Sequence, residues 1–440
     1  MSSIRNCCAA LTIVLVGYLT VIADDVFEKP VRLRADEEII DTGPQWGHSS
    51  PCIEDVDGDG LRDLLLGDFS GKFRVYKNSG SNEQPKYTDA GNLRAGDADA
   101  TVRIYCCVGG QPRFVDLDGD GIRDFISSSY DPGSCYFFRG LPEHKFAASS
   151  EVLDKSGVPV RTSPVQKQTY QSFGSFYAPV DWDADGDVDL LIGCFNGELK
   201  LRVNEGNAQH ASFAVDNQTI YAGSEPLKVN HHCCPLVVDW DGDGLWDVLA
   251  GCDDGSVTWF RNQGSKETPQ LAAGVVLVSK FAGNGYNLLR FTEEEIVPGI
   301  RSQIEVADLN GDGKLDLLLG DFCTAYEPRA NLSADETQQL KQLVADEESR
   351  SNPFVAKMEA LRKDFATRYP GDAIYSEEAD AAWQKEYKEL RESPEAKAME
   401  GQEAAFARAM RPLLGSTRGR GDRSFDLAKS HGYVWLFTRK

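Results

Sequence analysis

The sequence predicts an all-β fold, a five-bladed β-propeller of four-stranded antiparallel blades with an α-helical insertion in the last blade. Three observations predict it. An acidic motif recurs five times, at intervals of 61, 65, 58 and 69 residues, starting at Asp55, Asp116, Asp181, Asp239 and Asp308. Each motif is followed by a short apolar run and an alternating segment, whereas residues 324–430 are rich in Ala, Glu, Lys and Gln. Self-similarity at a fixed period of this length indicates a repeat architecture.

The first 23 residues differ from the rest of the chain. Arg5 precedes an apolar stretch of about fourteen residues, from Ala9 to Ile22, which ends in small residues before Asp24. This pattern is typical of a secretory signal peptide and is short for a membrane span. We therefore expect cleavage after residue 23 and an exported protein (secreted, periplasmic or cell-surface) without stable membrane insertion. An uncleaved membrane anchor is the alternative.

The net charge limits the classes of partner that the protein can bind, and the cysteine content bears on disulfide formation. The net charge of −23 argues against nucleic acid and anionic membrane surfaces as partners. Nine cysteines follow the predicted cleavage site: Cys52, Cys106, Cys107, Cys135, Cys194, Cys233, Cys234, Cys252 and Cys323. In an oxidising compartment we expect most of them to pair as disulfides, and the odd number leaves at least one free thiol or an intermolecular disulfide.

The acidic motif, exemplified by DVDGDGLRD, has the side chains that bind calcium. Oxygen ligands stand at positions 1, 3, 5 and 9, glycine stands at position 6, and position 7 can add a backbone carbonyl. We predict about five calcium ions with a structural role. The predicted ligands are Asp55, Asp57, Asp59, Leu61 and Asp63; Asp116, Asp118, Asp120, Ile122 and Asp124; Asp181, Asp183, Asp185, Asp187 and Asp189; Asp239, Asp241, Asp243, Leu245 and Asp247; and Asp308, Asn310, Asp312, Lys314 and Asp316.

The flanking residues exclude an EF-hand and predict strands instead. An EF-hand needs a Glu at position 12 and flanking helices, but position 12 here is Leu66, Ser127, Ile192, Ala250 or Leu319. The apolar pieces on both sides of the motif indicate a buried strand hairpin, followed by an alternating strand such as GKFRVYKN and a fourth strand such as PKYTDAGNL. Four antiparallel strands in about 60 residues are one propeller blade.

With these motifs the chain resembles the FG-GAP/VCBS class of calcium-binding propeller repeats, as found in integrin α heads and secreted bacterial proteins. The acidic motifs carry the resemblance, which covers the chain after residue 23 except for the insertion. The FG-GAP sequence itself survives only as FGSFYAP at residues 173–179. Integrin-type heads have seven blades and five are counted here, which puts a transfer of integrin function in doubt.

The two ends of the chain are expected to complete the last blade. The fifth repeat stops at Cys323, and residues 431–440 (HGYVWLFTRK) match the missing third strand. The segment DVFEKPVRL near the N-terminus resembles a fourth strand, so residues 24–323 and 431–440 form the propeller. Residues 324–430 are then a helical insertion, with helix starts at Ser333, Asn352, Ser376 and Ser393.

Strand order predicts that the calcium loops share one face and that a second set of residues gathers on the opposite, top face. Seven residues before the first Asp of three repeats stand His48, His232 and Arg301. We name as the top-face rim the following candidate ligand-binding residues: His48, Tyr130, Phe195, His231, His232, Asp253, Asp254 and Arg301. Cysteines lie near these residues in the sequence. They indicate either a transition-metal or redox site or structural disulfides between neighbouring blades.

Three functions follow from this pattern. The first is a non-catalytic, exported binding or adhesion scaffold for a glycan or an extracellular or periplasmic protein. The second is a carbohydrate-active enzyme, a polysaccharide lyase or hydrolase, that uses the top face. The third is a metal or redox protein that uses the Cys and His residues of the rim. No nucleophile elbow, phosphate-binding loop or zinc-protease motif is present in the sequence, which favours the first.

Overall fold

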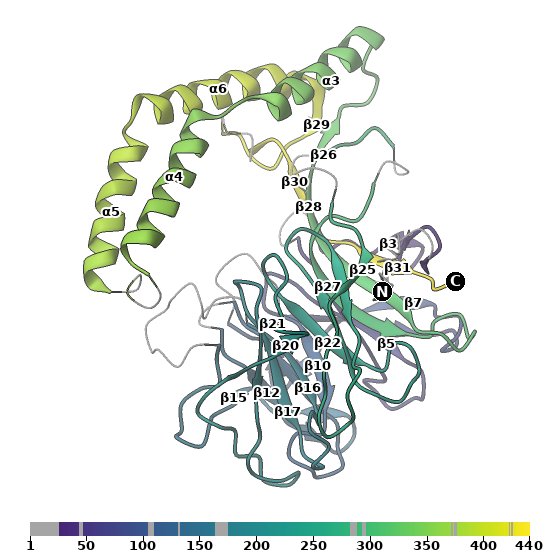
Figure 1. The fold of residues 1–440 in the computed structure, drawn as a ribbon. Coiled ribbons are helices and arrows are strands. Elements are labelled where there is room, and N and C mark those ends of the chain that lie inside the picture. The colour runs from purple at the N-terminus through teal and green to yellow at the C-terminus, as the bar shows by residue number, and fades with distance from the viewer. Residues whose placement is uncertain are drawn as a thin grey trace, which may run out of the picture.

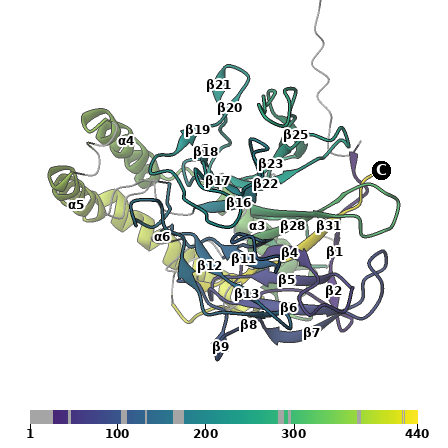
Figure 2. The ribbon, with the colours of Figure 1, turned by 90° about the horizontal axis from the view of Figure 1, so that it is seen from below.

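The computed structural model describes residues 26–43, 47–103, 110–130, 133–162, 175–281, 288–292, 296–370, 373, 376–421, 423 and 426–440. The predicted signal peptide and the pair Cys106 and Cys107 lie outside these residues. Sheets arranged around a common axis form the main body, and helices form an arm that projects from it (Figures 1 and 2). Within the described residues, none of the helices has the length and apolar character needed to cross a membrane.

Four sheets have the predicted pattern of four successive antiparallel strands, so the propeller with four-stranded blades is confirmed. Their strands are β4 (Ser50–Glu54), β5 (Asp63–Gly67), β6 (Phe73–Asn78) and β7 (Tyr87–Asn92); β10 (Pro112–Val115), β11 (Asp124–Ser127), β12 (Tyr136–Phe138) and β15 (Ser150–Glu151); β16 (Phe176–Val180), β17 (Asp189–Gly193), β18 (Leu199–Arg202) and β19 (Gln218–Thr219); and β22 (Cys234–Val238), β23 (Asp247–Gly251), β24 (Val257–Phe260) and β25 (Val275–Val278).

Short strands decorate these blades. Beside β7, the first blade carries the added strands β2 (Arg34–Ala35) and β3 (Glu38–Ile39). Two-stranded hairpins stand outside the blades and consist of β8 (Arg94–Ala95) with β9 (Ala98–Asp99), β13 (Gly140–Leu141) with β14 (Lys145–Phe146), and β20 (Tyr221–Ala222) with β21 (Glu225–Pro226).

The fifth repeat forms a larger, mixed sheet of seven strands, which differs from the predicted four-stranded fifth blade. Its central strand is β28 (Asp316–Pro328), which is 13 residues long and therefore reaches beyond the length of a blade. The first part of β28 pairs with β27 (Ile300–Ala307) and β31 (Val434–Phe437), and β31 pairs with β1 (Val31–Arg32). The far part pairs with β26 (Leu288–Leu289), β29 (Leu414–Ser416) and β30 (Lys429–His431). Segments from the two ends of the chain are thus hydrogen-bonded neighbours.

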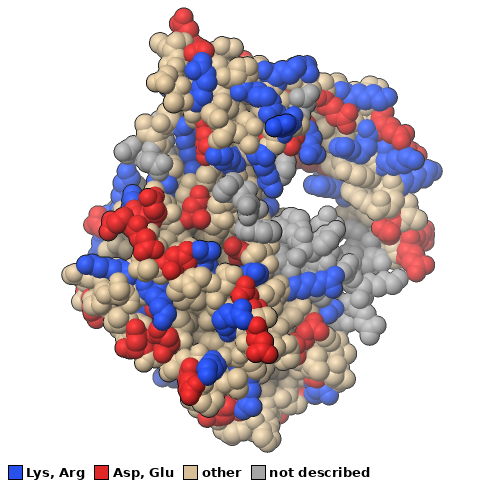
Figure 3. Space-filling view, turned by 180° about the vertical axis from the view of Figure 1, so that it is seen from behind, with Lys and Arg blue, Asp and Glu red and all other residues tan. Residues whose placement is uncertain are grey.

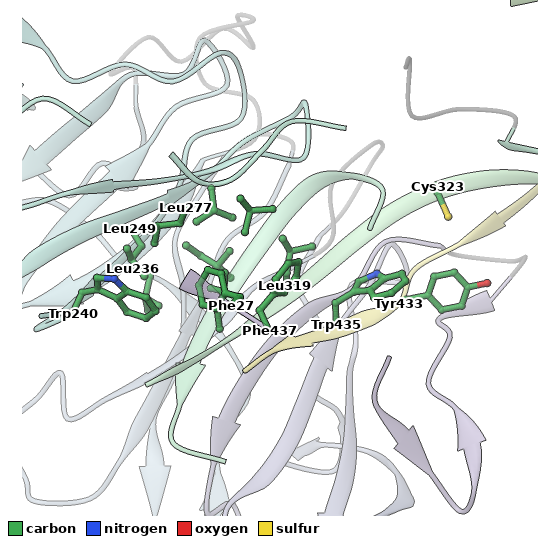
Figure 4. Packing of buried hydrophobic residues seen from close by; sticks show 14 residues of the cluster. Phe27, Leu236, Trp240, Leu249, Leu277, Leu319, Cys323, Tyr433, Trp435 and Phe437 are labelled. Carbon is green, nitrogen blue, oxygen red and sulfur yellow. The ribbon is translucent and has the colours of Figure 1, made fainter. Parts of the chain in front are cut away.

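The first strands of neighbouring sheets contact one another around the axis, and hydrophobic clusters fill the spaces between sheets. One cluster joins the fourth blade to the mixed sheet and contains Phe27, Trp240, Leu249, Leu319 and Phe437 (Figure 4). The second strands β5, β11, β17 and β23 are buried at every residue, as their continuous apolar runs predict.

Neighbouring blades approach so closely that glycine is required at the end of the second strand. A Cβ atom on Gly193 would lie 1.9 Å from the carbonyl oxygen of Cys233, and one on Gly67 would lie 1.8 Å from that of Gly110. No side chain fits at such a distance. The glycine at this position therefore follows from blade packing, and the second repeat, which has Ser128 there, is the exception.

The helical arm contains α3 (Ala334–Ser349), α4 (Pro353–Arg368), α5 (Glu377–Arg391), α6 (Pro394–Met410) and the short 3-10 helix η3 (Arg411–Leu413). The N-caps are Ser333, Asn352, Ser376 and Ser393, as predicted, and Ser333 forms a complete capping box with Glu336. Leu340 of α3 packs against Phe406 and Met410 of α6. The arm begins only after Pro328 because β28 continues into the predicted insertion.

Candidate functional site

The acidic motifs lie in the loops between the first and second strand of each sheet, as the repeat pattern predicts. In the first loop, both oxygens of Asp55 accept backbone N–H groups, from Gly58 at 2.7 Å and from Gly60 at 2.9 Å. Position 9, Asp63, accepts N–H groups of Val56 and Asn78 and thereby ties the loop to its strands. Left-handed residues at positions 4 and 6 turn each loop; in the third loop Ala184 takes this conformation (φ 58).

Carboxylates converge in four of the loops. Their ligand atoms lie within 4.8 Å of one another in the groups Asp55, Asp57 and Asp63; Asp116, Asp118 and Asp124; Asp181, Asp183 and Asp185; and Asp239, Asp241 and Asp243. Several of these oxygens are buried and have no hydrogen-bond partner, namely Oδ1 of Asp116, Asp118, Asp181, Asp183 and Asp241. Buried carboxylate oxygens that lack donors need a cation, so this donor set fits calcium.

The loops differ in how much positive charge the protein itself supplies. In the fourth loop, Arg261 lies 2.6 Å from Asp241 and 3.0 Å from Asp243. The third loop, whose five aspartates have no Lys or Arg among the ion pairs of the described residues, is the most acidic. There burial and the neighbouring carboxylates raise the pKa of Asp187 to about 6, and burial raises the pKa of Asp189 to about 7.

The fifth loop is the weakest candidate for a metal site. It keeps the turn geometry, since the two oxygens of Asp308 accept N–H groups of Gly311 at 2.7 Å and Gly313 at 2.9 Å. Position 3, however, is Asn310, whose Nδ2 donates to Asp312 at 3.2 Å. Among the described residues no acidic cluster forms here, because an amide replaces one carboxylate.

At the opposite ends of the strands, the structure brings the predicted top-face rim together. His48, His232 and Arg301 all have left-handed backbones, with φ of 59°, 49° and 60°, at the same position of three repeats. Only a few per cent of non-glycine residues adopt this conformation, and a recurrence at one repeat position is a reason to consider a function there. His48 interacts electrostatically with Arg301, His232 and Asp253.

Aromatic rings support these three residues. Phe195 makes an edge contact with His232 at 4.3 Å between centroids and with Tyr130 at 6.2 Å. Phe69 stacks on His48 at 5.1 Å, and Arg301 lies 5.0 Å over the ring of Phe322. His231 and Asp254 stand slightly outside: His231 meets Phe195 edge-on at 6.0 Å, and Asp254 accepts from Ser256.

His232, Asp253 and Arg301 form the charged centre of the rim. Nδ1 of His232 lies 2.8 Å from Oδ1 of Asp253, and Nε of Arg301 lies 3.5 Å from the same oxygen. Nε2 of His232 is buried and has no hydrogen-bond partner. Burial raises the pKa of Asp253, but the hydrogen bond to His232 and nearby positive charge outweigh it, so the pKa is lowered. Asp253 is therefore ionised, and it orients an imidazole whose second nitrogen is an acceptor.

Burial also lowers the pKa of His48 and of His232 below 6.5, which gives a testable pH dependence. Because the unfolded chain takes up protons that the folded rim does not, the stabilisation is complete above pH 6.5 and is lost as the pH falls below it. Each histidine contributes a slope of at most about 1.4 kcal/mol per pH unit. Urea unfolding of His48→Asn between pH 5 and 8 should show a shallower slope than wild type. The exposed His210→Gln variant is the control, and an identical slope in all three proteins would contradict the assignment.

Two rim residues, Phe69 and Phe322, were missed by the sequence analysis. They stand at position 15 of their repeats, the position that also supplies Tyr130, Phe195 and Asp253. The same alignment of the repeats contained the signal for them. Gln303, buried at the mouth, was also missed; its Nε2 lies 3.3 Å from Nε2 of His48.

The predicted disulfides do not form among the described residues, where Cys52, Cys135, Cys194, Cys233, Cys234, Cys252 and Cys323 are free and buried. Neighbours on a strand point to opposite faces, so Cys233 and Cys234 enter different hydrophobic clusters. Burial raises the pKa of Cys194 and Cys233, which makes these thiols unreactive. The metal-like groups of the described chain consist of aspartates alone, so none combines Cys with His.

Comparisons with known proteins agree with the repeat pattern. A family model described as FG-GAP-like repeat matches residues 239–319. Integrin alpha-PS2 of Drosophila melanogaster is 27% identical over 230 residues, which is 45% of this chain. The matched region is 14% of the length of that integrin.

Solved structures with a similar chain path include two glycoside hydrolases. A GH43 β-xylosidase/α-arabinofuranosidase from a compost microbial metagenome has a TM-score of 0.35 and 10% identity, covering 67% of this chain and 90% of its own. A GH43_1 enzyme from Xanthomonas citri has a TM-score of 0.37 and 12% identity, covering 63% and 82%. Similarity at this level carries no conclusion about activity.

Proposed function

We propose that this protein, a β-propeller built from FG-GAP-like repeats, is an exported, calcium-stabilised scaffold that binds a glycan or protein partner through its top-face rim. In this proposal the mixed seven-stranded sheet serves as the fifth blade, and each of the five acidic loops holds one ion. The observation that carries it is the placement of His48, His232 and Arg301 in strained, left-handed positions around one mouth.

Calcium is supported by the buried, unpartnered oxygens of the acidic loops. It would bind to the carboxylates and to the backbone carbonyl at position 7 of each motif, and it would neutralise repulsion that the fold otherwise concentrates there. Because these loops join the two innermost strands of each blade, the ions act on the scaffold and leave the rim to bind the partner.

The rim chemistry supports a partner rich in hydroxyl or carboxylate groups. It combines an arginine, an ionised aspartate and a neutral imidazole with the rings of Phe195, Phe69 and Phe322. Such a mixture of directional polar groups and flat apolar surfaces is typical of sites that bind small polar rings or side chains.

A binding screen tests this proposal. Calcium-loaded protein is applied to a glycan array and to cell-wall and matrix extracts, and the affinity of any ligand found is measured for His232→Gln and Arg301→Lys. We expect each substitution to weaken binding by at least about tenfold, because each removes a charged or directional hydrogen bond. Arg94→Gln, which changes an exposed arginine of a distant hairpin, is the matched control. Ligands that bind all variants equally would contradict a role for the rim.

One observation favours the second candidate function, a carbohydrate-active enzyme. A histidine whose Nδ1 faces a carboxylate while Nε2 is without a partner has the arrangement of a general base, and His232 and Asp253 have it. Incubation with acidic and neutral polysaccharides, followed by assays for new reducing ends and unsaturated products, distinguishes the two. If a polysaccharide is cleaved by the wild type but not by His232→Gln, the protein is an enzyme. If no polysaccharide is cleaved, the binding scaffold remains the proposed function.

A further inference from the structure

A second candidate site lies away from the rim, where the helical arm joins the mixed sheet. A cavity of about 980 Å³ is bordered by β1–β3, by the segment around Arg290, by the end of β28 and the start of α3, and by His431 and Tyr433. It therefore lies between parts of the chain that are far apart in the sequence. Basic and acidic side chains are interspersed over the visible face of the molecule (Figure 3).

Arg290 is the unusual residue of this cavity. It is only 9% exposed, yet its hydrogen-bond partners are a phenol and a thiol: Nη1 donates to Tyr433 Oη at 3.2 Å, and Nη2 donates to Cys323 Sγ at 2.8 Å. Its Nε is buried and has no hydrogen-bond partner. Among the described residues, Arg290 forms no ion pair with a carboxylate. A buried guanidinium without a carboxylate is costly, and a bound anion would offset that cost.

Two of the three acids that line the cavity, Asp41 and Glu327, are already engaged with other groups, and the third, Glu38, is exposed to solvent. Asp41 lies 2.7 Å from Nδ1 of His431 and accepts N–H groups of Gly43 and Gly432. Glu327 lies 2.6 Å from Nζ of Lys429 and accepts from Ser416 at 2.8 Å. These carboxylates are therefore not available to Arg290.

Asp321, a buried acid on which Arg290 acts electrostatically, is likewise satisfied elsewhere. Its oxygens accept from the backbone N–H groups of Gly299 and Tyr433 and from Trp435 Nε1, at 2.7, 2.8 and 2.9 Å. The cavity lining as a whole has four arginines and one histidine against three carboxylates, although the chain carries a net charge of −23. Positive charge is thus concentrated locally at this joint.

His431 adds a second polar group to the same cavity. Its Nδ1 is held by Asp41 and lies 3.0 Å from Tyr433 Oη, while its Nε2 is buried, lacks a hydrogen-bond partner and lies 3.8 Å from Glu327. The imidazole ring is stacked on Tyr433, with centroids 5.4 Å apart. Arg290 and His431 are therefore both fixed in orientation by Tyr433.

We propose that this cavity binds an organic monocarboxylate, with Arg290 receiving the carboxylate and His431 hydrogen-bonding a neighbouring oxygen. A guanidinium matches the planar carboxylate with two parallel N–H donors. One cation without an acidic partner compensates a monoanion, whereas the nearby acids repel the second charge of phosphate or sulfate. Apolar lining residues, including Ile39, Ile296 and Leu332, suit the organic part of such a ligand. This site does not depend on the function proposed for the rim.

Calorimetry on the calcium-loaded full chain tests the proposal with sodium glucuronate and sodium acetate as probes, and with phosphate and sulfate as competing anions. We expect saturable glucuronate binding that Arg290→Gln weakens by about ten- to a hundredfold, the loss of a charge-assisted hydrogen-bonded pair. Arg94→Gln, which changes an exposed arginine outside the cavity, is the matched control and should change binding less than threefold.

Arg290→Lys and Tyr433→Phe keep the test decisive if Arg290→Gln fails to fold. Arg290→Lys retains the positive charge but loses the two parallel N–H donors of the guanidinium. Tyr433→Phe retains the aromatic ring but loses the hydroxyl that holds Arg290. Each substitution should weaken glucuronate binding by about tenfold. Arg301→Lys at the rim should leave the Arg290-dependent component of glucuronate binding unchanged, which separates this site from the rim. Glucuronate binding that is indifferent to Arg290, or absent, overturns the site, and tighter binding of phosphate or sulfate overturns the carboxylate assignment.

Discussion

Removal of divalent cations with a chelator is expected to lower the unfolding temperature by roughly 10–20 °C. An ion present at a hundredfold excess over its Kd stabilises the native state by about 2.7 kcal/mol. Four acidic loops hold carboxylate clusters, and about 1 kcal/mol corresponds to about 2–4 °C for a domain of some 150–250 residues, with smaller shifts for larger ones. Without the ions, the carboxylates within each cluster repel one another, and this repulsion lowers the unfolding temperature further.

Calorimetry in calcium and in chelator, combined with metal analysis, checks this result. Asp183→Asn, in the loop that has no cation of its own, should lose one ion per molecule and about 2–3 kcal/mol. Asp89→Asn, which changes an exposed aspartate paired with Arg74 outside the loops, is the control and should keep every ion. An unfolding temperature that is the same in calcium and in chelator would contradict the calcium proposal but would not bear on the binding function proposed for the rim.

A second large effect is expected from the buried ion pair in the centre of the propeller. Arg113 of β10 and Glu305 of β27 are 5% and 12% exposed and lie 2.8 Å apart, so they link the second blade to the mixed sheet across the axis. Nη2 of Arg113 also donates to the carbonyl of Ile304 at 2.7 Å. Arg113→Met should cost about 3–5 kcal/mol, because it leaves the carboxylate of Glu305 buried without a counter-charge.

The double variant Arg113→Met/Glu305→Leu separates the pair from the loss of packing. It should be clearly more stable than Arg113→Met, because an apolar pair has no uncompensated charge. Urea unfolding of the two single variants and the double variant gives the coupling free energy. Lys72→Met, which breaks the exposed pair of Lys72 with Asp99, should change stability by less than about 1 kcal/mol. Equal stability of Arg113→Met and wild type would mean that the pair contributes nothing.

Much of the blade architecture could be predicted from the sequence because the repeats carry it. The acidic motif locates the turn, the apolar run locates the buried second strand, and alignment of the motifs placed His48, His232 and Arg301 on one face. Phe69 and Phe322 were accessible by the same alignment.

What could not be predicted lies outside the repeat. The length of β28 depends on pairing with strands from the insertion, so the mixed sheet has no signature within one repeat. The disulfide prediction was wrong for the described cysteines because a count of cysteines ignores the alternation of side chains along a strand. The cavity around Arg290 joins four distant segments, none of which has a motif.

The pairing of β1 with β31 has a consequence for how the molecule is made. Val31 aligns with Leu436, so strand β1 cannot form its hydrogen bonds to β31 until some four hundred further residues have been synthesised. Until then the pairing of β1 with β31 is missing, and the nascent chain cannot complete its tertiary structure. Contacts this remote in sequence slow folding and prolong exposure of sticky surfaces. Completion of the fold is therefore a post-translational event.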